Sequence, residues 1–137
     1  MKNKLNLLVF LLLAVTSSMH AQKVKLKKDK AFIEDVHVFN TEKRIAEWVS
    51  LIDKETEEEL IFIRVEYGSK QGKEDYTIYK FIKEDIVVEV SGYNLLKNLV
   101  KFLYKNKVFD LEGNLDLDKI ELLKTKFDEN ITNRTDF

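Results

Sequence analysis

The chain has 137 residues, of which 34% are charged, and its 23 basic and 24 acidic residues give a formal net charge of −1. This balance argues against nucleic acid and against an anionic membrane surface as partners. The sequence contains no cysteine, which excludes disulfides and removes the usual attachment point for a lipid anchor. We therefore expect packing and backbone pairing to stabilise the fold, with no nucleic-acid partner and no stable membrane anchor.

The amino-terminal segment predicts export from the cell. Lys2 and Lys4 form a short basic start, an apolar stretch follows at 5–15, and Ala21 is a small residue at a suitable cleavage point. This three-part pattern is typical of a secretory signal peptide. The apolar stretch is also shorter than the ~20 residues that a bilayer-spanning helix needs. A buried N-terminal helix is the alternative, which the lack of further apolar residues after position 22 disfavours.

Processing after Ala21 defines the expected mature protein. Removing the signal peptide, 1–21, from 137 residues leaves 116 residues, 22–137, which suits a single α+β domain with one hydrophobic core. The loss of Lys2 and Lys4 shifts the formal net charge from −1 to −3. No second apolar run reaches membrane-spanning length, so we expect a protein of the periplasm or the extracellular space.

The first part of this domain shows the period of two that is typical of β-strands. Short alternating runs rich in β-branched and aromatic residues are separated by polar turns, with no helix between them, which favours an antiparallel meander. Lys28-Asp29 is predicted as one of these turns. The predicted strands are 23–27, 31–34, 36–39, 45–52, 60–67, 76–82 and 86–90.

Residues 41–59 allow two interpretations. A helix capped at 41–44 would place four apolar side chains at helical spacing, whereas the same stretch also alternates as a strand. We favour the strand, because the hairpins on both sides leave little room for a crossover. The apolar residues concerned are Ile45, Trp48, Val49 and Ile52.

The pattern changes to a helical period after Gly92. One stripe predicts a first helix that Ser91 or Asn94 caps, and a second stripe predicts a helix with Asp118 and Glu121 as a capping box. We therefore predict an α+β fold, an antiparallel β-meander followed by two C-terminal helices packed on the sheet. The first stripe is Leu95, Leu96, Leu99, Val100 and Leu103, and the second is Leu117, Ile120, Leu123 and Phe127. The predicted common core contains Trp48, Phe62, Ile63, Tyr79, Phe81, Leu99 and Leu103.

The expected mature chain contains few groups that could form a site with a histidine. His37 is its only histidine, and strand spacing would place His37 and Asp35 on one face with Glu34 on the other. A metal site normally needs several converging ligands, and no serine stands in a nucleophile-elbow context. We therefore assign no catalytic, metal or cofactor-binding residue and expect no cofactor. The serines considered are Ser50, Ser69 and Ser91.

Acidic clusters leave a carboxylate mechanism open as an alternative. A glycosidase needs two carboxyl groups facing each other across a cleft, whereas acids clustered in turns are usually solvated. The stretch 110–118 resembles a calcium loop, but Gly113 stands at the wrong position for one. We predict a hairpin-like turn and a helix cap there instead. The clustered acids are Glu55, Glu57, Glu58 and Glu59, and Glu84 with Asp85.

A run of lysines at the start of the mature chain is the strongest local charge feature. Lysines at alternate positions of a terminal strand protect an exposed sheet edge against aggregation, and contact with acidic surface polymers is the alternative. No aromatic residue is interleaved with the run, as a nucleic-acid site would require. The lysines are Lys23, Lys25, Lys27, Lys28 and Lys30.

Three segments resemble small exported bacterial proteins of unknown function. They are the mature start 22–31 (QKVKLKKDKA), 100–110 (VKFLYKNKVFD) and 128–131 (DENI). The resemblance implies an exported protein and assigns no catalytic residue. We expect a non-catalytic binding or envelope-associated module with an envelope or extracellular partner. The alternative is a small secreted hydrolase that uses clustered carboxylates.

Overall fold

A computed structural model describes residues 22–68 and 74–133. The predicted signal peptide, 1–21, and Ser69 lie outside the described residues. Seven strands form one antiparallel sheet in the order β1 to β7, and two helices follow them, which confirms the predicted α+β meander. The elements are β1 (Val24–Lys27), β2 (Lys30–Ile33), β3 (Val36–Arg44), β4 (Trp48–Ile52), β5 (Glu59–Glu66), β6 (Tyr76–Phe81), β7 (Ile86–Ser91), α2 (Leu96–Lys105), α3 (Leu117–Phe127) and the 3₁₀ turn η2 (Ile131–Asn133).

Tight turns explain why the first strands form hairpins. Lys28 and Asp29 join β1 to β2, as predicted, and Glu34 and Asp35 join β2 to β3. All four residues have positive φ angles, between 50° and 64°. Two successive residues of this kind form the turn whose twist matches that of the flanking strands. The short hairpins therefore come from local backbone geometry without any glycine.

Residues 41–59 adopt the strand alternative. Arg44 pairs with Trp48 across a tight turn, in which Glu47 N donates to Arg44 O at 3.0 Å and Ala46 has a φ of 63°. The strands β3 and β4 continue from this turn in antiparallel register.

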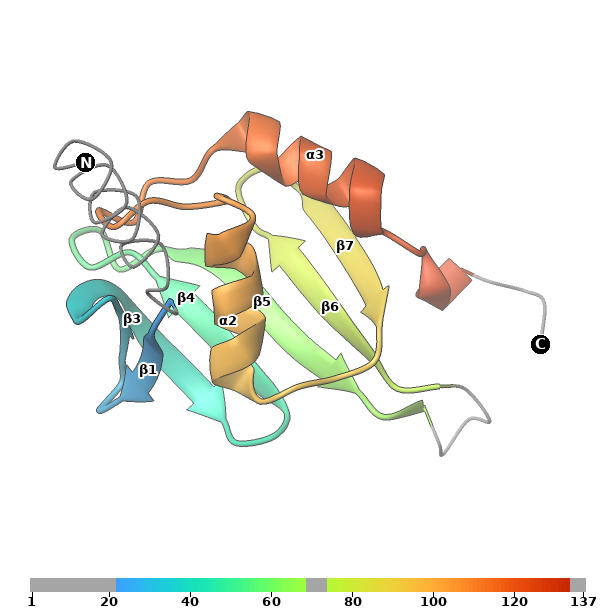
Figure 1. Cartoon of the computed structure of the whole chain (residues 1–137), viewed down its shortest axis with the longest axis horizontal. Coiled ribbons are helices and arrows are strands. Elements are labelled where there is room, and N and C mark those ends of the chain that lie inside the picture. The colour runs from blue at the N-terminus through green and yellow to red at the C-terminus, as the bar shows by residue number, and fades with distance from the viewer. Residues whose placement is uncertain (1–21, 69–73, 134–137) are drawn as a thin grey trace, which may run out of the picture.

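One face of the sheet forms the core, and α2 lies across it (Figure 1). Ile61 and Ile63 of β5 are completely buried, as are their β4 partners, Leu51 and Val49. The helix contributes its apolar stripe to the same cluster. Its buried residues are Leu96, Leu99, Val100 and Leu103.

The predicted core was wrong at two aromatic residues. Trp48 and Phe62 lie on the opposite face of the sheet, where both are half-buried and their rings are 5.8 Å apart. Phe62 precedes the buried Ile63, and neighbouring residues of a strand point to opposite faces. The other five predicted residues, Ile63, Tyr79, Phe81, Leu99 and Leu103, are in the core.

A β-bulge brings two successive residues of β3 into the core. Ala31 pairs with Phe39 and Phe32 pairs with His37, so Val38 is an additional residue on β3. Val38 and Phe39 are both buried. The ring of Phe39 meets that of Phe109 edge-on at 4.9 Å, which ties the chain between the two helices to the sheet.

The residues named as helix caps were wrong, although a helix cap does lie within 110–118, as predicted. The helix α2 starts after Leu95 without a side-chain cap, and α3 starts after Asp116, whose carboxylate accepts from the amide of Lys119 at 3.2 Å. Asp118 therefore lies inside the first turn of α3. A bridge between Phe109 and Leu115 closes the preceding turn and places Asp116 directly before the helix.

The segment after α3 covers the outer edge of β7. The amide of Glu89 donates to Asp128 Oδ1 at 2.9 Å, and Glu129 N donates to Glu89 O at 2.8 Å. The carboxylate of Glu89 accepts from both the amide and the hydroxyl of Thr132 at 2.7 Å. An exposed strand edge is open to pairing with other chains, and these contacts occupy that edge of the sheet.

Candidate functional site: an apolar pocket at one end of the sheet

The single histidine of the described residues has a structural environment. His37 Nε2 lies 3.0 Å from Asn40 Oδ1, and its ring packs against Phe32 with 5.7 Å between centroids. Asp35 forms ion pairs with Lys23 and Lys25 instead. Within 22–68 and 74–133, no three His, Cys, Asp or Glu side chains gather into a group that fits a metal ion.

The serine and carboxylate candidates are tied to other groups. Ser50 Oγ donates to Glu59 Oε1 at 2.6 Å, and Ser91 Oγ donates to Glu129 Oε1 at 2.7 Å, so neither serine is paired with the histidine. The acids at 55, 57 and 58 are exposed in the turn between β4 and β5, and Glu59 is exposed at the start of β5. The amides of Thr56 and Glu55 lower the pKa of Asp53 by donating to its carboxylate.

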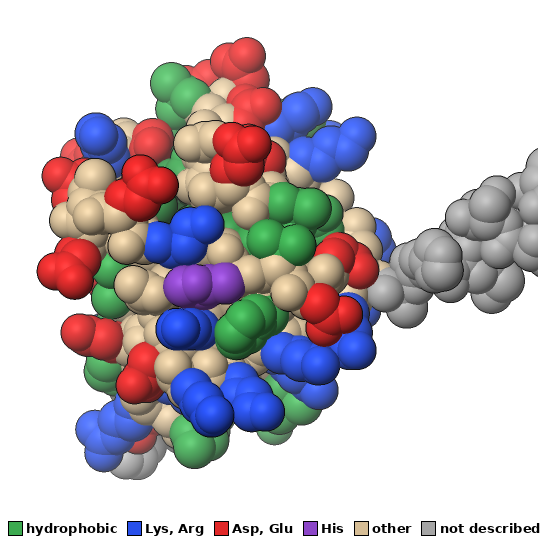
Figure 2. Space-filling model, turned by 90° about the vertical axis from the view of Figure 1, so that its left-hand side faces the viewer, with side chains coloured by type: hydrophobic (Ala, Val, Ile, Leu, Met, Phe, Trp, Pro, Cys, Tyr) green, Lys and Arg blue, Asp and Glu red, His purple; other side chains and the backbone are tan. Residues whose placement is uncertain are grey.

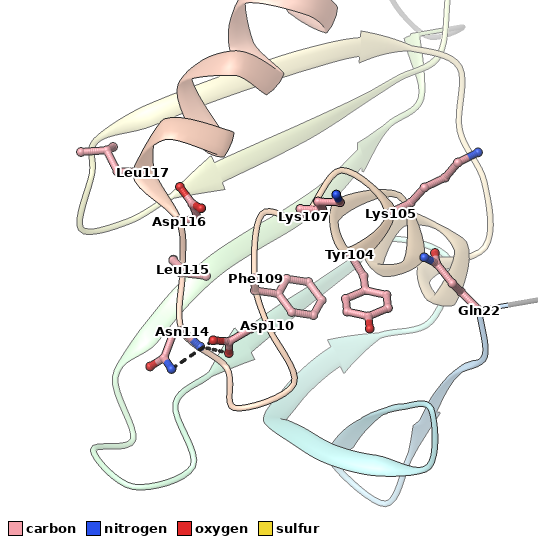
Figure 3. A pocket seen from close by; sticks show the side chains of 10 residues that line it. All are labelled: Gln22, Tyr104, Lys105, Lys107, Phe109, Asp110, Asn114, Leu115, Asp116 and Leu117. Carbon is pink, nitrogen blue, oxygen red and sulfur yellow. Dashed lines mark hydrogen bonds between the residues drawn. The ribbon is translucent and has the colours of Figure 1, made fainter.

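The segment that resembles a calcium loop forms a turn beside a hollow lined by both polar and apolar side chains (Figure 3). Asp110 Oδ1 accepts from the amides of Glu112 and Asn114, both at 2.9 Å, and these bonds organise the turn. The amide of Asn114 is the main cause that lowers the pKa of Asp110. With Asp116 engaged as the cap of α3, both aspartates of the hollow serve the local fold. The prediction of a hairpin-like turn is confirmed.

The lysine-rich strand lies at the edge of the sheet that α3 does not cover. Figure 2 views the molecule from this side and shows Lys and Arg side chains gathered near the histidine, with acidic side chains among them. Lys23 and Lys25 share Asp35 at 3.9 and 3.5 Å, and all three side chains are at least half exposed. Such exposed pairs contribute little to stability. This face is therefore charged and solvated.

A further candidate is an apolar pocket of about 320 Å³ where the β3–β4 turn meets the chain that leads into α2. Figure 1 shows this turn and this chain close together at the lower end of the sheet. The volume lies at the lower end of the range typical of small-ligand sites, about 300–1,000 Å³. The pocket is lined by Leu26, Lys43, Ile45, Ala46, Tyr67, Tyr93, Asn94, Leu95, Leu96 and Lys97.

The pocket gathers the most exposed large apolar side chains of the described residues. Ile45, Leu95 and Tyr93 are 82%, 64% and 61% exposed, which makes them the three most exposed large hydrophobic side chains among the described residues. Tyr67 is 42% exposed and belongs to the same pocket. Single exposed apolar residues are ordinary, but a contiguous apolar patch marks an interaction site or a ligand-binding groove.

Aromatic contacts give the pocket one fixed wall. Tyr67 Oη donates to Ala46 O at 2.5 Å, which connects the end of β5 to the β3–β4 turn. The rings of Tyr67 and Tyr93 meet edge-on with 5.7 Å between centroids. The wall is therefore assembled before any ligand binds, which lowers the conformational cost of binding.

Sequence reasoning missed this pocket. Leu95 belongs to the predicted apolar stripe of the first helix but is exposed in the structure, and Ile45 belongs to 41–59, which the sequence allows as a strand or a helix. The available signal was the presence of Ile45 and Tyr93 next to predicted turns, where exposed apolar residues need an explanation. Their convergence depends on which strand ends lie side by side, and the local pattern does not contain that information.

Comparison with protein-family models, with curated proteins and with solved structures finds no match for this chain. The resemblance to small exported bacterial proteins therefore stays a prediction. Within the described residues, no helix has the length and apolar character that crossing a membrane would require.

Proposed function

We propose that this chain is an exported, non-catalytic binding module that holds an apolar group in the pocket between the β3–β4 turn and the start of α2. The observation that carries the proposal is the convergence of Ile45, Tyr93 and Leu95 on one hollow. Burying these side chains against a ligand would remove apolar surface from water, which favours association by about 25 cal/mol per Å². Export rests on the signal-peptide pattern at 1–21.

Binding is tested with N-phenyl-1-naphthylamine, an uncharged probe whose fluorescence increases in apolar surroundings. We expect saturable binding to the mature protein and at least about tenfold weaker binding to Leu95→Asn, because a polar side chain at the pocket removes apolar contact. Leu122→Asn is the matched control, since Leu122 is an exposed leucine of α3 that does not line the pocket. Absence of saturable binding, or equal weakening in both variants, would contradict the proposal.

Export is tested by the intact mass of the protein recovered from the native host. We expect a chain that begins at Gln22 in a soluble envelope or culture fraction. A species that retains Met1 and sediments with membranes would contradict this part of the proposal, whereas cleavage a few residues earlier would only move the boundary.

A further inference from the structure

The charges around the pocket have one sign. Lys43 and Lys97 are the only charged residues that line it, and neither forms an ion pair with an acidic side chain within the described residues. The chain as a whole carries a net negative charge. Two lysines that form no ion pair within the described residues therefore line an apolar hollow.

The ammonium group of Lys43 is held at the pocket. Lys43 lies on β3 and its Nζ donates to Leu26 O at 3.3 Å, across to β1. This hydrogen bond uses one of three donors and leaves two for a ligand. Lys97 is an exposed residue of the first turn of α2 and lines the same hollow.

The start of α2 adds a third positive element. No side chain caps this helix and no acidic residue occurs in its first turn. The first amides of a helix carry partial positive charge and donate to an anion. The amide of Leu95, just before α2, already donates to Asn94 Oδ1 at 2.8 Å. The other helix, α3, differs in both respects, with Asp116 as its cap and Asp118 in its first turn. The two lysines thus line the apolar pocket beside the start of α2.

We infer that the ligand of this pocket is an anionic amphiphile, an apolar chain or ring that ends in a carboxylate. This inference rests on the proposed function. The apolar part contacts Tyr67, Tyr93 and Leu95, and the carboxylate lies at the rim, between the ammonium groups of Lys43 and Lys97. A charge-assisted hydrogen bond of this kind is roughly twice as strong as a neutral one. The small volume of the pocket, about 320 Å³, limits it to one short chain or one ring system.

Displacement of bound N-phenyl-1-naphthylamine from the mature protein tests the carboxylate. Decanoate and decanol share the same chain and differ in charge at pH 7.5. We expect decanoate to displace the probe at a concentration about tenfold lower than decanol, as one charge-assisted contact predicts. Displacement by decanol at an equal or lower concentration than decanoate would overturn the inference of a carboxylate ligand. The proposed function would then still stand, because it depends only on binding of the probe. A protein that binds neither the probe nor decanoate would overturn both.

Charge-neutralising variants identify the residues. In Lys97→Gln we expect the decanoate concentration for half-displacement to rise about tenfold and that for decanol to stay within about twofold. Lys101→Gln is the matched control, because Lys101 is one turn further along α2 and does not line the pocket. Equal responses of the two variants to decanoate would overturn the assignment. Binding to phosphatidylglycerol vesicles that decanoate does not displace would also overturn it, since it would make a membrane surface the occupant.

Discussion

The middle of α2 and the chain at its start carry the same kind of side chain with opposite outcomes. Leu99 is 5% exposed and belongs to the core, whereas Leu95, one turn earlier, is 64% exposed and lines the pocket. Both leucines belong to one helical period, so the pattern does not distinguish them. Leu99 is in the core with the sheet, whereas Leu95 directly precedes α2 and shares a pocket with the exposed β3–β4 turn. The difference shows that a helical stripe predicts the side of the helix on which a residue lies, whereas its burial depends on which part of the protein packs against that side.

The largest expected effect is a difference in stability between alanine variants of these two leucines. Leu99→Ala is expected to lower the free energy of unfolding by ~2–5 kcal/mol, because it leaves a cavity in a closed core. Leu95→Ala is expected to change it by less than ~0.5 kcal/mol, as an exposed position does. Urea unfolding of both variants measures the difference. A similar loss for both would mean that the pocket end is as closed as the core.

Two glycines offer the same comparison for the backbone. Gly113 and Gly92 have nearly equal φ angles, 86° and 87°, and a side chain at either costs about 1–2 kcal/mol in backbone strain. An added Cβ at Gly113 would lie 3.1 Å from Val38 O, whereas at Gly92 it would meet nothing within 4 Å. Thermal unfolding is expected to show a greater loss for Gly113→Ala than for Gly92→Ala. A greater loss of stability for Gly92→Ala than for Gly113→Ala would contradict the close packing of Gly113 against Val38.

The covered edge of β7 is expected to respond to acid. Burial raises the pKa of Asp128, but the donors at Glu89 N, Lys124 Nζ and Asn130 N outweigh it and lower the pKa below its ordinary value of 3.8. A depressed pKa stabilises the fold above the unfolded value, and this contribution disappears as the pH falls through the folded value. Asp128→Asn is thus expected to have a lower free energy of unfolding than the parent at pH 7. This difference is expected to decrease as the pH falls below about 4. A gap that stays constant between pH 7 and pH 3 would contradict this account.

The smallest effect is expected at His37. His37→Ala removes one hydrogen bond to Asn40 and a ring contact with Phe32, both on the half-exposed face away from the pocket. We expect a stability change of about 1 kcal/mol or less and unchanged binding of N-phenyl-1-naphthylamine. Loss of the biological phenotype in a variant that folds and is exported normally would give His37 a direct role and reopen the metal or general-base hypothesis.

The strands and turns could be predicted because their determinants are local. The alternation of 60–67 and the turn at Lys28-Asp29 each depend on a few neighbouring residues, and the structure places β5 and a tight turn there. The error at Trp48 and Phe62 came from ignoring that same alternation, since Phe62 and Ile63 cannot face one core together. The caps were misjudged because Asp116 is positioned by the bridge between Phe109 and Leu115, a contact outside the helix.

The amino-acid sequence by itself determined the class of the fold, the order of its elements and the turn chemistry, because periodicity and backbone preference act over a few residues. Only the tertiary structure decided where the apolar pocket lies. Ile45, Tyr67 and Tyr93 are far apart in the chain and meet because β3, β5 and β7 all end on the same side of one meander. Lys43 and Lys97 line the same pocket for the same reason. The candidate site is therefore a property of how strand ends align, which no local pattern encodes.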